Sequence, residues 1–466
     1  MKGIREAAER DRIMAEMDGK GSPAGVAYEA AVEDYEGRRA YFSRLGDYRL
    51  SGRGDLDLFK AFAERFLHIA RRGGAIGCVL PRQLLAGAGS APLRRAYLAD
   101  STPLAIDVIE NRGHWAFENV HGQFTIVLAA VGRRAPTDLD RIPVAGPIRS
   151  PKELAAAGEN RIDWSLADLA QGSDTLDVPL IGDAEMGRVF AAMLHHPRFG
   201  DEIPGSWRTL PYRELDATND RPGLFETGPF DGAWEVWKGS SFDRYTPGSG
   251  PPAFWADSEK LKARLQAKRL TSRGVWGQFP AEIVKDTGTL PILGTRIAFR
   301  DVTRATDSRT MRACLVPPST ALVHKAPGLV WPRGGPADVA FVLGMLCSLP
   351  FDWAARRRVE ATMSFAILNG LPVPRAPRGH DRIAHLAARL SSIDDRYADF
   401  AREVGVEVGP IPPDERSDME AEIDALVAHA YGLSEADLRV IFRDFTERAV
   451  PPAYRERVVE HYGRAA

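Results

Sequence analysis

The stretch from Arg49 to Ala130 constrains the fold most, because segments with different apolar periodicities follow one another in it. Residues 56–70 place apolar side chains at helical spacing, which predicts a helix with one buried face. The residues expected on that face are Leu56, Phe59, Phe62, Phe66 and Ile69. Gly73-Gly74 follows two arginines and predicts the end of this helix.

A strand, a second helix and two further strands are predicted next. The apolar run Ala75 to Leu80, closed by Pro81, predicts a buried strand. A helix around Leu93 to Leu98 follows, and the segments 104–109 and 124–130 are further strand candidates. This order of elements is typical of the second half of an α/β sheet.

The motifs in this stretch resemble the later motifs of the gamma-class adenine DNA methyltransferases. In order they are GDLDLFKAFAE, RRGGAIGCVLP, LRR and ENRGHWAFENVHGQFTIVLA. The resemblance is strongest to the methylase parts of type IIG restriction–modification enzymes and to the BREX and DISARM phage-defence methylases. It implies methyl transfer from S-adenosylmethionine to the exocyclic amine of adenine. Phe117 matches the family aromatic that stacks on the flipped target base; the alternative is that Phe117 is a core or turn aromatic.

Two motifs that this resemblance leads us to expect are missing from the sequence. The four Pro-Pro pairs begin at Pro251, Pro317, Pro412 and Pro451, and none follows Asn, Asp or Ser and precedes an aromatic residue. Gly52-Arg53-Gly54-Asp55 follows no apolar strand, so we reject it as a cofactor loop. The chain therefore resembles the carboxy-terminal half of a methyltransferase. S-adenosylmethionine is expected only in an assembled enzyme, bound by a partner chain that carries the glycine loop and the Pro-Pro-aromatic motif.

Charge is distributed unevenly along the chain, although the net charge is only −2. Residues 221–380 contain 22 Lys+Arg and 13 Asp+Glu, a balance of +9, so the remainder carries −11. A basic segment between acidic flanks favours contact with double-stranded DNA, and random clustering is the alternative. The sequence contains neither 18 consecutive apolar residues nor a signal-peptide pattern, so we expect a cytoplasmic protein without membrane contact.

The strongest DNA-recognition signal is the segment RIAFRDVTRATDSRTMR, residues 296–312. It resembles the RxxFRDxxxxxxxRTM segment of the same methylases' target-recognition domain. Arginine suits phosphates and guanine edges, and hydroxyl groups suit phosphates. The expected DNA-binding residues are Arg296, Arg300, Arg304, Arg309, Thr310 and Arg312. The alternative is a solvated strand–loop–strand surface, and for Arg356-Arg357-Arg358 we expect an exposed helix face.

The sequence argues against two other kinds of site. Cys78, Cys314 and Cys347 are far apart and have no metal-ligand spacing. Asp231, Glu235 and Lys238 do not form a nuclease site, because Glu and Lys three residues apart lie on opposite faces of a strand.

The predicted fold is an α/β half-sheet of a methyltransferase-like domain, followed by an α+β target-recognition domain and a helical C-terminus. The expected parts are a helical arm (1–48), the half-domain (49–135), a connecting region (136–215), the recognition domain (216–378) and the helical region (379–466). Helices are expected at 4–17, 26–45, 183–194, 341–349, 352–368, 382–404 and 418–431. The alternatives to a split methyltransferase are a non-catalytic DNA-binding specificity or sensing subunit and the remnant of a disrupted methylase gene.

Overall fold

The computed structural model describes residue 12 and residues 22–44, 48–51, 57–122, 124–272 and 274–465. The chain forms two compact units. Unit 1 comprises Met1–Leu166 with Thr175–Asp177, and unit 2 comprises Ala167–Asp174 with Val178–Ala466. The boundary between them lies inside the predicted connecting region.

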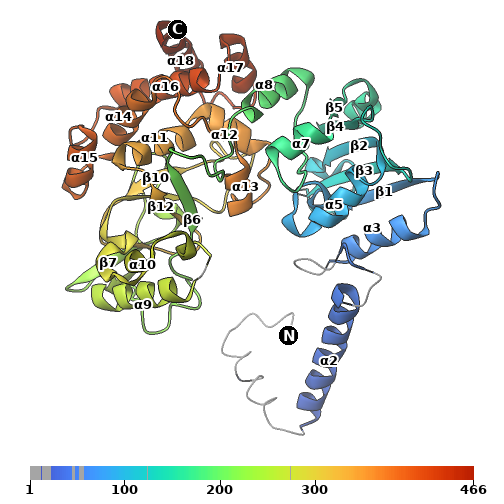
Figure 1. Ribbon diagram of the computed structural model, residues 1–466, viewed down its shortest axis with the longest axis horizontal. Helices are drawn as coiled ribbons and strands as arrows, with labels where there is room; N and C mark the ends of the chain where they lie inside the picture. The colour runs from blue at the N-terminus through green and yellow to red at the C-terminus, as the bar shows by residue number, and fades with distance from the viewer. Residues whose placement is uncertain are drawn as a thin grey trace. The chain divides into compact units, whose positions relative to one another are not determined.

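Unit 1 contains a five-stranded sheet in the order β1-β3-β2-β4-β5 (Figure 1). Its elements are α2 (Pro23–Arg44), α3 (Leu58–Ile69), β1 (Ala75–Pro81), α4 (Gln83–Ala86), α5 (Ala91–Leu98), β2 (Thr102–Glu110), β3 (Thr125–Gly132), β4 (Ile142–Ile148), α6 (Pro151–Ala155) and β5 (Ile162–Trp164). The predicted order from the first helix to the third strand is confirmed. The helix expected at 26–45 corresponds to α2, whereas the one expected at 4–17 and the rejected loop at 52–55 lie outside the described residues.

The strands β1, β2 and β4 run in the same direction, so their carboxyl ends lie on the same side of this sheet. β3 is antiparallel to both β1 and β2, so β1 and β2 are parallel to each other. β4 is parallel to β2, and β5 is antiparallel to β4. The last two strands lie in the predicted connecting region, so the sheet extends further than the sequence indicated.

The helix α3 forms where the sequence predicts it, but its buried face coincides only in part with the predicted one. Asp57 caps it by accepting a hydrogen bond from the Phe59 amide at 3.2 Å. The side chains that pack towards β1 and α5 include Ala63 and Leu67. Phe62 and Ile69 are 58% and 64% exposed, so the predicted burial is wrong for these two side chains, whereas Phe59 and Phe66 pack against the core cluster as predicted. The buried face also holds Glu64, whose carboxylate accepts hydrogen bonds from the Leu50 and Ser51 amides.

The strand β1 is buried on one face only. Ile76 and Leu80 belong to a core cluster with α3 and α5, whereas Val79 on the opposite face is 56% exposed. The expected fully buried strand is therefore wrong, because its two faces have different environments.

Unit 2 combines two small sheets with a helical C-terminal part. The four-stranded sheet has the order β10-β9-β12-β6 and the three-stranded sheet the order β11-β7-β8. The strands are β6 (Arg208–Tyr212), β7 (Ala233–Trp237), β8 (Phe254–Asp257), β9 (Arg296–Phe299), β10 (Ala313–Val316), β11 (Thr320–Leu322) and β12 (Gly328–Arg333). A shared cluster around Trp237, Phe242 and Cys314 packs between them. The coarse prediction of an α+β part followed by helices is confirmed.

The helices of unit 2 are α7 (Leu166–Gly172, which begins in unit 1), α8 (Ala184–Leu194), α9 (Ser258–Thr271), α10 (Ala281–Lys285), α11 (Pro336–Cys347), α12 (Leu349–Arg356), α13 (Phe365–Gly370), α14 (His380–Ser391), α15 (Ala398–Val404), α16 (Pro413–Ala430), α17 (Glu435–Phe442) and α18 (Pro452–Ala465). The helix expected at 352–368 is wrong, because α12 ends at Arg356 and α13 begins at Phe365. Similarly, 382–404 divides into α14 and α15.

Among the described residues, no single helix is both long and apolar enough to cross a membrane. The consecutive helices α11 and α12 reach the required length and composition together, but they meet at 58°. The side chains from Val339 to Arg356 are buried inside unit 2.

Candidate functional site

The carboxyl ends of β1, β2 and β4 mark the first candidate site. Ligands of open α/β sheets bind in the crevice beyond the carboxyl ends of parallel strands. Residues 111–122 follow β2 directly and therefore occupy this edge of unit 1.

A single buried side chain organises this segment. Asn111 accepts hydrogen bonds from the amides of Phe117 at 3.0 Å and Ala116 at 3.3 Å. Its amide nitrogen donates to the carbonyl oxygens of Phe117 at 2.8 Å and Val120 at 2.9 Å. All the hydrogen-bonding capacity of this side chain is thus used to hold the turn that carries Phe117.

The turn held by Asn111 places Phe117 beyond the carboxyl end of β2. Its ring is half-buried against a small core cluster that includes Ile109 and Ile148. This position suits a stacking surface, and it also suits a turn aromatic that closes the cluster. Base stacking by Phe117 therefore stays a prediction.

The charges beside Phe117 bear on cofactor binding. The carboxylate of Glu110, at the end of β2, lies 3.0 Å from Arg149 Nε and 3.3 Å from Arg112 Nε. Both contacts involve the same carboxylate oxygen, Oε2. Binding of S-adenosylmethionine in an assembled enzyme stays a prediction. Both guanidinium groups are more than half exposed, which suits a phosphate-bearing ligand.

The predicted DNA-binding segment is largely turned into the interior of unit 2. Arg296 lies on β9 and is 3% exposed, and its guanidinium donates to Glu214 at 2.8 Å and to the Thr320 carbonyl at 2.6 Å. Thr310 is fully buried and donates to the Arg304 carbonyl at 3.0 Å. The prediction of DNA contact is wrong for these two side chains, because their polar atoms are used inside the unit.

The remaining four residues differ in exposure. Arg309 is 7% exposed, with its guanidinium 5.4 Å from the Phe445 ring centre, so it too is an interior residue. Arg300 and Arg312 are partly exposed and lie 3.5 Å and 2.6 Å from the carboxylate of Asp243. Arg304 is exposed. DNA contact stays a prediction for Arg300, Arg304 and Arg312.

The three arginines at the end of α12 and just beyond it are also buried. Arg356 donates to the carbonyl oxygens of Asp307 at 2.6 Å and Ser308 at 3.1 Å, and pairs with Asp352 at 3.0 Å. The expected exposed helix face is wrong for Arg356, Arg357 and Arg358, which are at most 7% exposed. Arg356 instead anchors the loop that carries Arg309.

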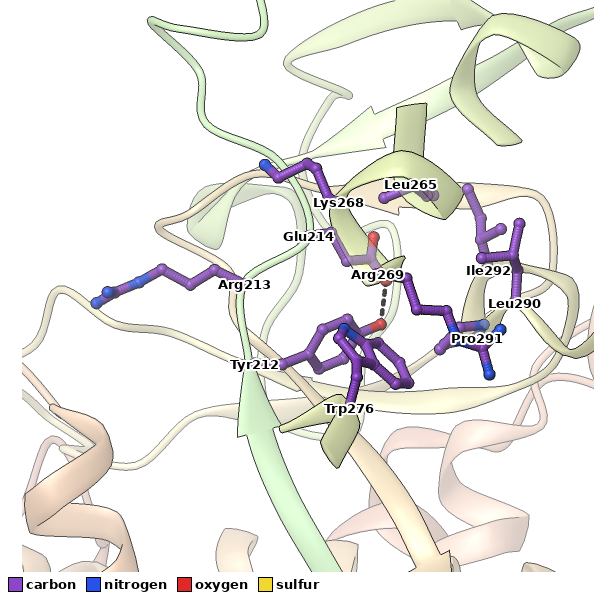
Figure 2. A pocket seen from close by; sticks show the side chains of 10 residues that line it. All are labelled: Tyr212, Arg213, Glu214, Leu265, Lys268, Arg269, Trp276, Leu290, Pro291 and Ile292. Atoms are coloured by element: carbon purple, nitrogen blue, oxygen red, sulfur yellow. Dashed lines mark hydrogen bonds between the residues drawn. The ribbon is translucent and has the colours of Figure 1, made fainter. Parts of the chain in front are cut away.

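A pocket in unit 2 forms the second candidate site (Figure 2). Its empty space, including open solvent at its mouth, is about 310 Å³. It is lined by Tyr212, Arg213, Glu214, Leu265, Lys268, Arg269, Trp276, Leu290, Pro291 and Ile292. In Figure 2 the Tyr212 hydroxyl and the Glu214 carboxylate face each other, and Arg213 extends away from them.

Glu214 is the centre of a buried network beside this pocket. One carboxylate oxygen accepts from the Tyr212 hydroxyl and from Arg296, and the other accepts from the Leu322 amide at 2.7 Å. Burial, with the nearby Glu214 charge, raises the pKa of Tyr212 well above its ordinary value, so the phenol stays a donor. The Glu214 carboxylate and the Tyr212 hydroxyl thus have partners from within the unit, whereas Arg296 Nη1 is buried without a partner among the described residues.

Sequence reasoning missed this pocket, because its residues come from distant segments. Tyr212 is the last residue of β6 and Glu214 follows the strand. Lys268 and Arg269 lie on α9, and Trp276 lies beyond that helix. The one available signal was the spacing of basic residues on α9, where Arg264 and Lys268 lie one turn apart.

Neither family models nor curated proteins match this chain. Among solved structures, the chain is similar to the type IIL restriction–modification enzyme MmeI in complex with DNA, with a TM-score of 0.45 and 12% identity, over 91% of this chain and 55% of MmeI. It is also similar to the type IIG restriction endonuclease BpuSI, with a TM-score of 0.30 and 15% identity, over 93% of this chain and 53% of BpuSI. The chain thus spans about half the length of either protein. Similarities at these TM-scores do not identify a function.

Proposed function

We propose that this chain is the DNA-recognition half of a site-specific adenine DNA methyltransferase in a restriction–modification or phage-defence system. The observation that carries the proposal is the edge of the unit 1 sheet. Within the described residues β1 pairs only with β3, and its other side is open. The sequence motifs of residues 54–129 supply the resemblance to the methyltransferase family.

The open edge lies beside an apolar surface, which we call the α3 face. Its members Leu58, Phe62 and Ile69 are 67%, 58% and 64% exposed. Natural sheet edges are usually short, charged or covered, whereas β1 has an apolar sequence of seven residues. Burying each large side chain of the α3 face would contribute about 1.5–3 kcal/mol. A partner that supplies a further strand and an apolar surface fits both features.

The resemblance specifies that partner. In the resembled fold, the strand with the Pro-Pro-aromatic motif pairs with the strand corresponding to β1. The added strand would bring the catalytic motif to the carboxyl ends of the strands, where Phe117 lies. The partner chain would also supply the glycine loop for S-adenosylmethionine, the methyl donor, while Phe117 would stack on the flipped adenine.

Methylation of host DNA, mapped with and without this gene, tests the proposal. We expect site-specific adenine methylation only when the chain and its partner are both present, and none from the purified chain alone. Phe62→Glu should abolish co-purification with the partner, whereas Leu139→Glu, at a site that is 88% exposed, should not. Robust methylation by the isolated chain would contradict the proposal that a partner chain supplies the catalytic half. DNA binding without methylation in any combination would favour a specificity or sensing subunit.

A further inference from the structure

The charges around the unit 2 pocket do not balance. Two cationic side chains, Lys268 and Arg269, line it, and Glu214 is the acidic residue among the described lining. Arg213 also borders the pocket, but it extends away and lies 4.0 Å from Asp301. Glu214 is already neutralised by Arg296, at 2.7 Å, and both residues are at most 3% exposed. The lining therefore keeps an excess of positive charge.

Lys268 shares its counterion with a neighbour. Its ammonium group lies 2.8 Å from Asp220, and Arg264 lies 2.5 Å from the same carboxylate. Asp220 is buried, with a side chain that is 1% exposed. One carboxylate cannot neutralise two cations, so a positive charge remains at the rim of the pocket.

Arg269 supplies a buried hydrogen-bond donor without an acceptor. It is 2% exposed, lies 4.7 Å from the Trp276 ring centre and donates to Thr289 Oγ1 at 3.1 Å. Its Nε is buried and has no partner among the described residues. The guanidinium of Arg269 therefore brings a positive charge that is only partly hydrogen-bonded to the wall of the pocket.

We propose that the pocket binds a phosphate group. A phosphate offers several acceptor oxygens and a negative charge, which match the guanidinium group of Arg269 and the ammonium group of Lys268 (Figure 2). The apolar wall of Leu265, Leu290 and Ile292 limits competing water around these contacts. The phosphate could come from the DNA backbone or from a free phosphate ion. The DNA backbone is the source if the proposed function holds, and this part of the proposal rests on that function.

Thermal unfolding of the full chain in inorganic phosphate, against chloride at equal ionic strength, tests the site itself. Lys268→Met removes a cation that lines the pocket. Arg264→Met is the matched control, because Arg264 pairs with the same Asp220 carboxylate but does not line the pocket. We expect phosphate to raise Tm by about 2 °C for the wild type and Arg264→Met, and not for Lys268→Met. No rise in the wild type, or equal rises in all three, would overturn the proposal.

Duplex binding across a salt series identifies the source. If DNA supplies the phosphate, Lys268→Met should reduce the log–log salt slope by about 1 relative to Arg264→Met. Equal slopes, with the phosphate effect intact, would support a free phosphate and overturn the DNA source. If phosphate stabilises the chain but the chain binds no DNA, the phosphate site is supported and the proposed function is contradicted.

Discussion

At the scale of single residues, several charged side chains of this protein are buried and serve the structure. Arg94 illustrates the structural kind: it is fully buried, pairs with Asp177 at 2.5 Å and donates to the Leu84 and Thr175 carbonyl oxygens. Arg296 and Arg356 play comparable roles in unit 2. The role of such a residue is tested by measuring the free energy of unfolding of a variant, whereas a DNA contact is tested by measuring DNA affinity.

The first prediction concerns the buried pair of Arg296 and Glu214. Arg296→Met should lower the free energy of unfolding by about 3–5 kcal/mol, because it leaves a buried carboxylate without its partner. Arg304→Met, at an exposed position of the same segment, should change it by less than about 0.5 kcal/mol. Denaturant unfolding measures both. Equal effects of the two variants would show that Arg296 is not the interior residue described here.

The second prediction concerns His196, whose ring lies 3.2 Å from the Tyr431 carbonyl oxygen. Burial lowers the pKa of His196 below 6.5, with the His195 charge acting in the same direction and the carbonyl against it. The unfolded chain therefore binds the proton more readily, so stability is present above about pH 6.5 and is lost as pH falls through the folded pKa.

His196→Gln should remove this part of the pH dependence, measured as the free energy of unfolding between about pH 7.5 and about pH 5.5. The neighbouring exposed His195→Gln serves as the control and should retain it. A wild type and His196→Gln variant with parallel pH profiles would disprove the assignment.

At the scale of elements, β1 has one paired and one open side. Arg82 N donates to Thr125 O at 3.0 Å, and amide directions alternate along an antiparallel strand. The amides of Ile76, Cys78 and Leu80 therefore point towards β3. Those of Gly77 and Val79 point towards the open side.

The third prediction follows from this alternation. In the isolated chain, hydrogen exchange at Gly77 and Val79 should be much faster than at Ile76, Cys78 and Leu80. Binding of a partner strand should slow exchange at the first pair and leave the others little changed. Strong protection of Gly77 and Val79 in a monomer would count against an open edge.

At the scale of the whole molecule, the basic segment 221–380 lies entirely within unit 2, so DNA binding is expected to depend on that unit. Arg304→Ala should weaken duplex binding and reduce the log–log salt slope by about 1 if its side chain neutralises one phosphate.

Arg402→Ala is the matched control for this fourth prediction. It removes a charge from a side chain that is 72% exposed, in the same unit but beyond the basic segment. Binding of the two variants is compared at several salt concentrations. Identical behaviour of Arg304→Ala and Arg402→Ala would exclude a specific contact by Arg304.

Local patterns in the sequence were enough to predict elements. Helix α8 lies where a helix is expected at 183–194, and the Asp183 side chain caps its first turn. The order from α3 to β3 and the position of Phe117 at the end of β2 were also predictable, because apolar periodicity acts over a few residues.

Tertiary structure alone decided which side chains are buried. Arg296 meets Glu214 across 82 positions of the chain, and the residues of the pocket meet across similar separations. The buried Arg296 and the exposed Arg304 look alike in sequence, because burial depends on which distant segment packs against each. For the same reason the sequence determined that α3 has an apolar side, and only the fold showed that Phe62 and Ile69 on it remain uncovered.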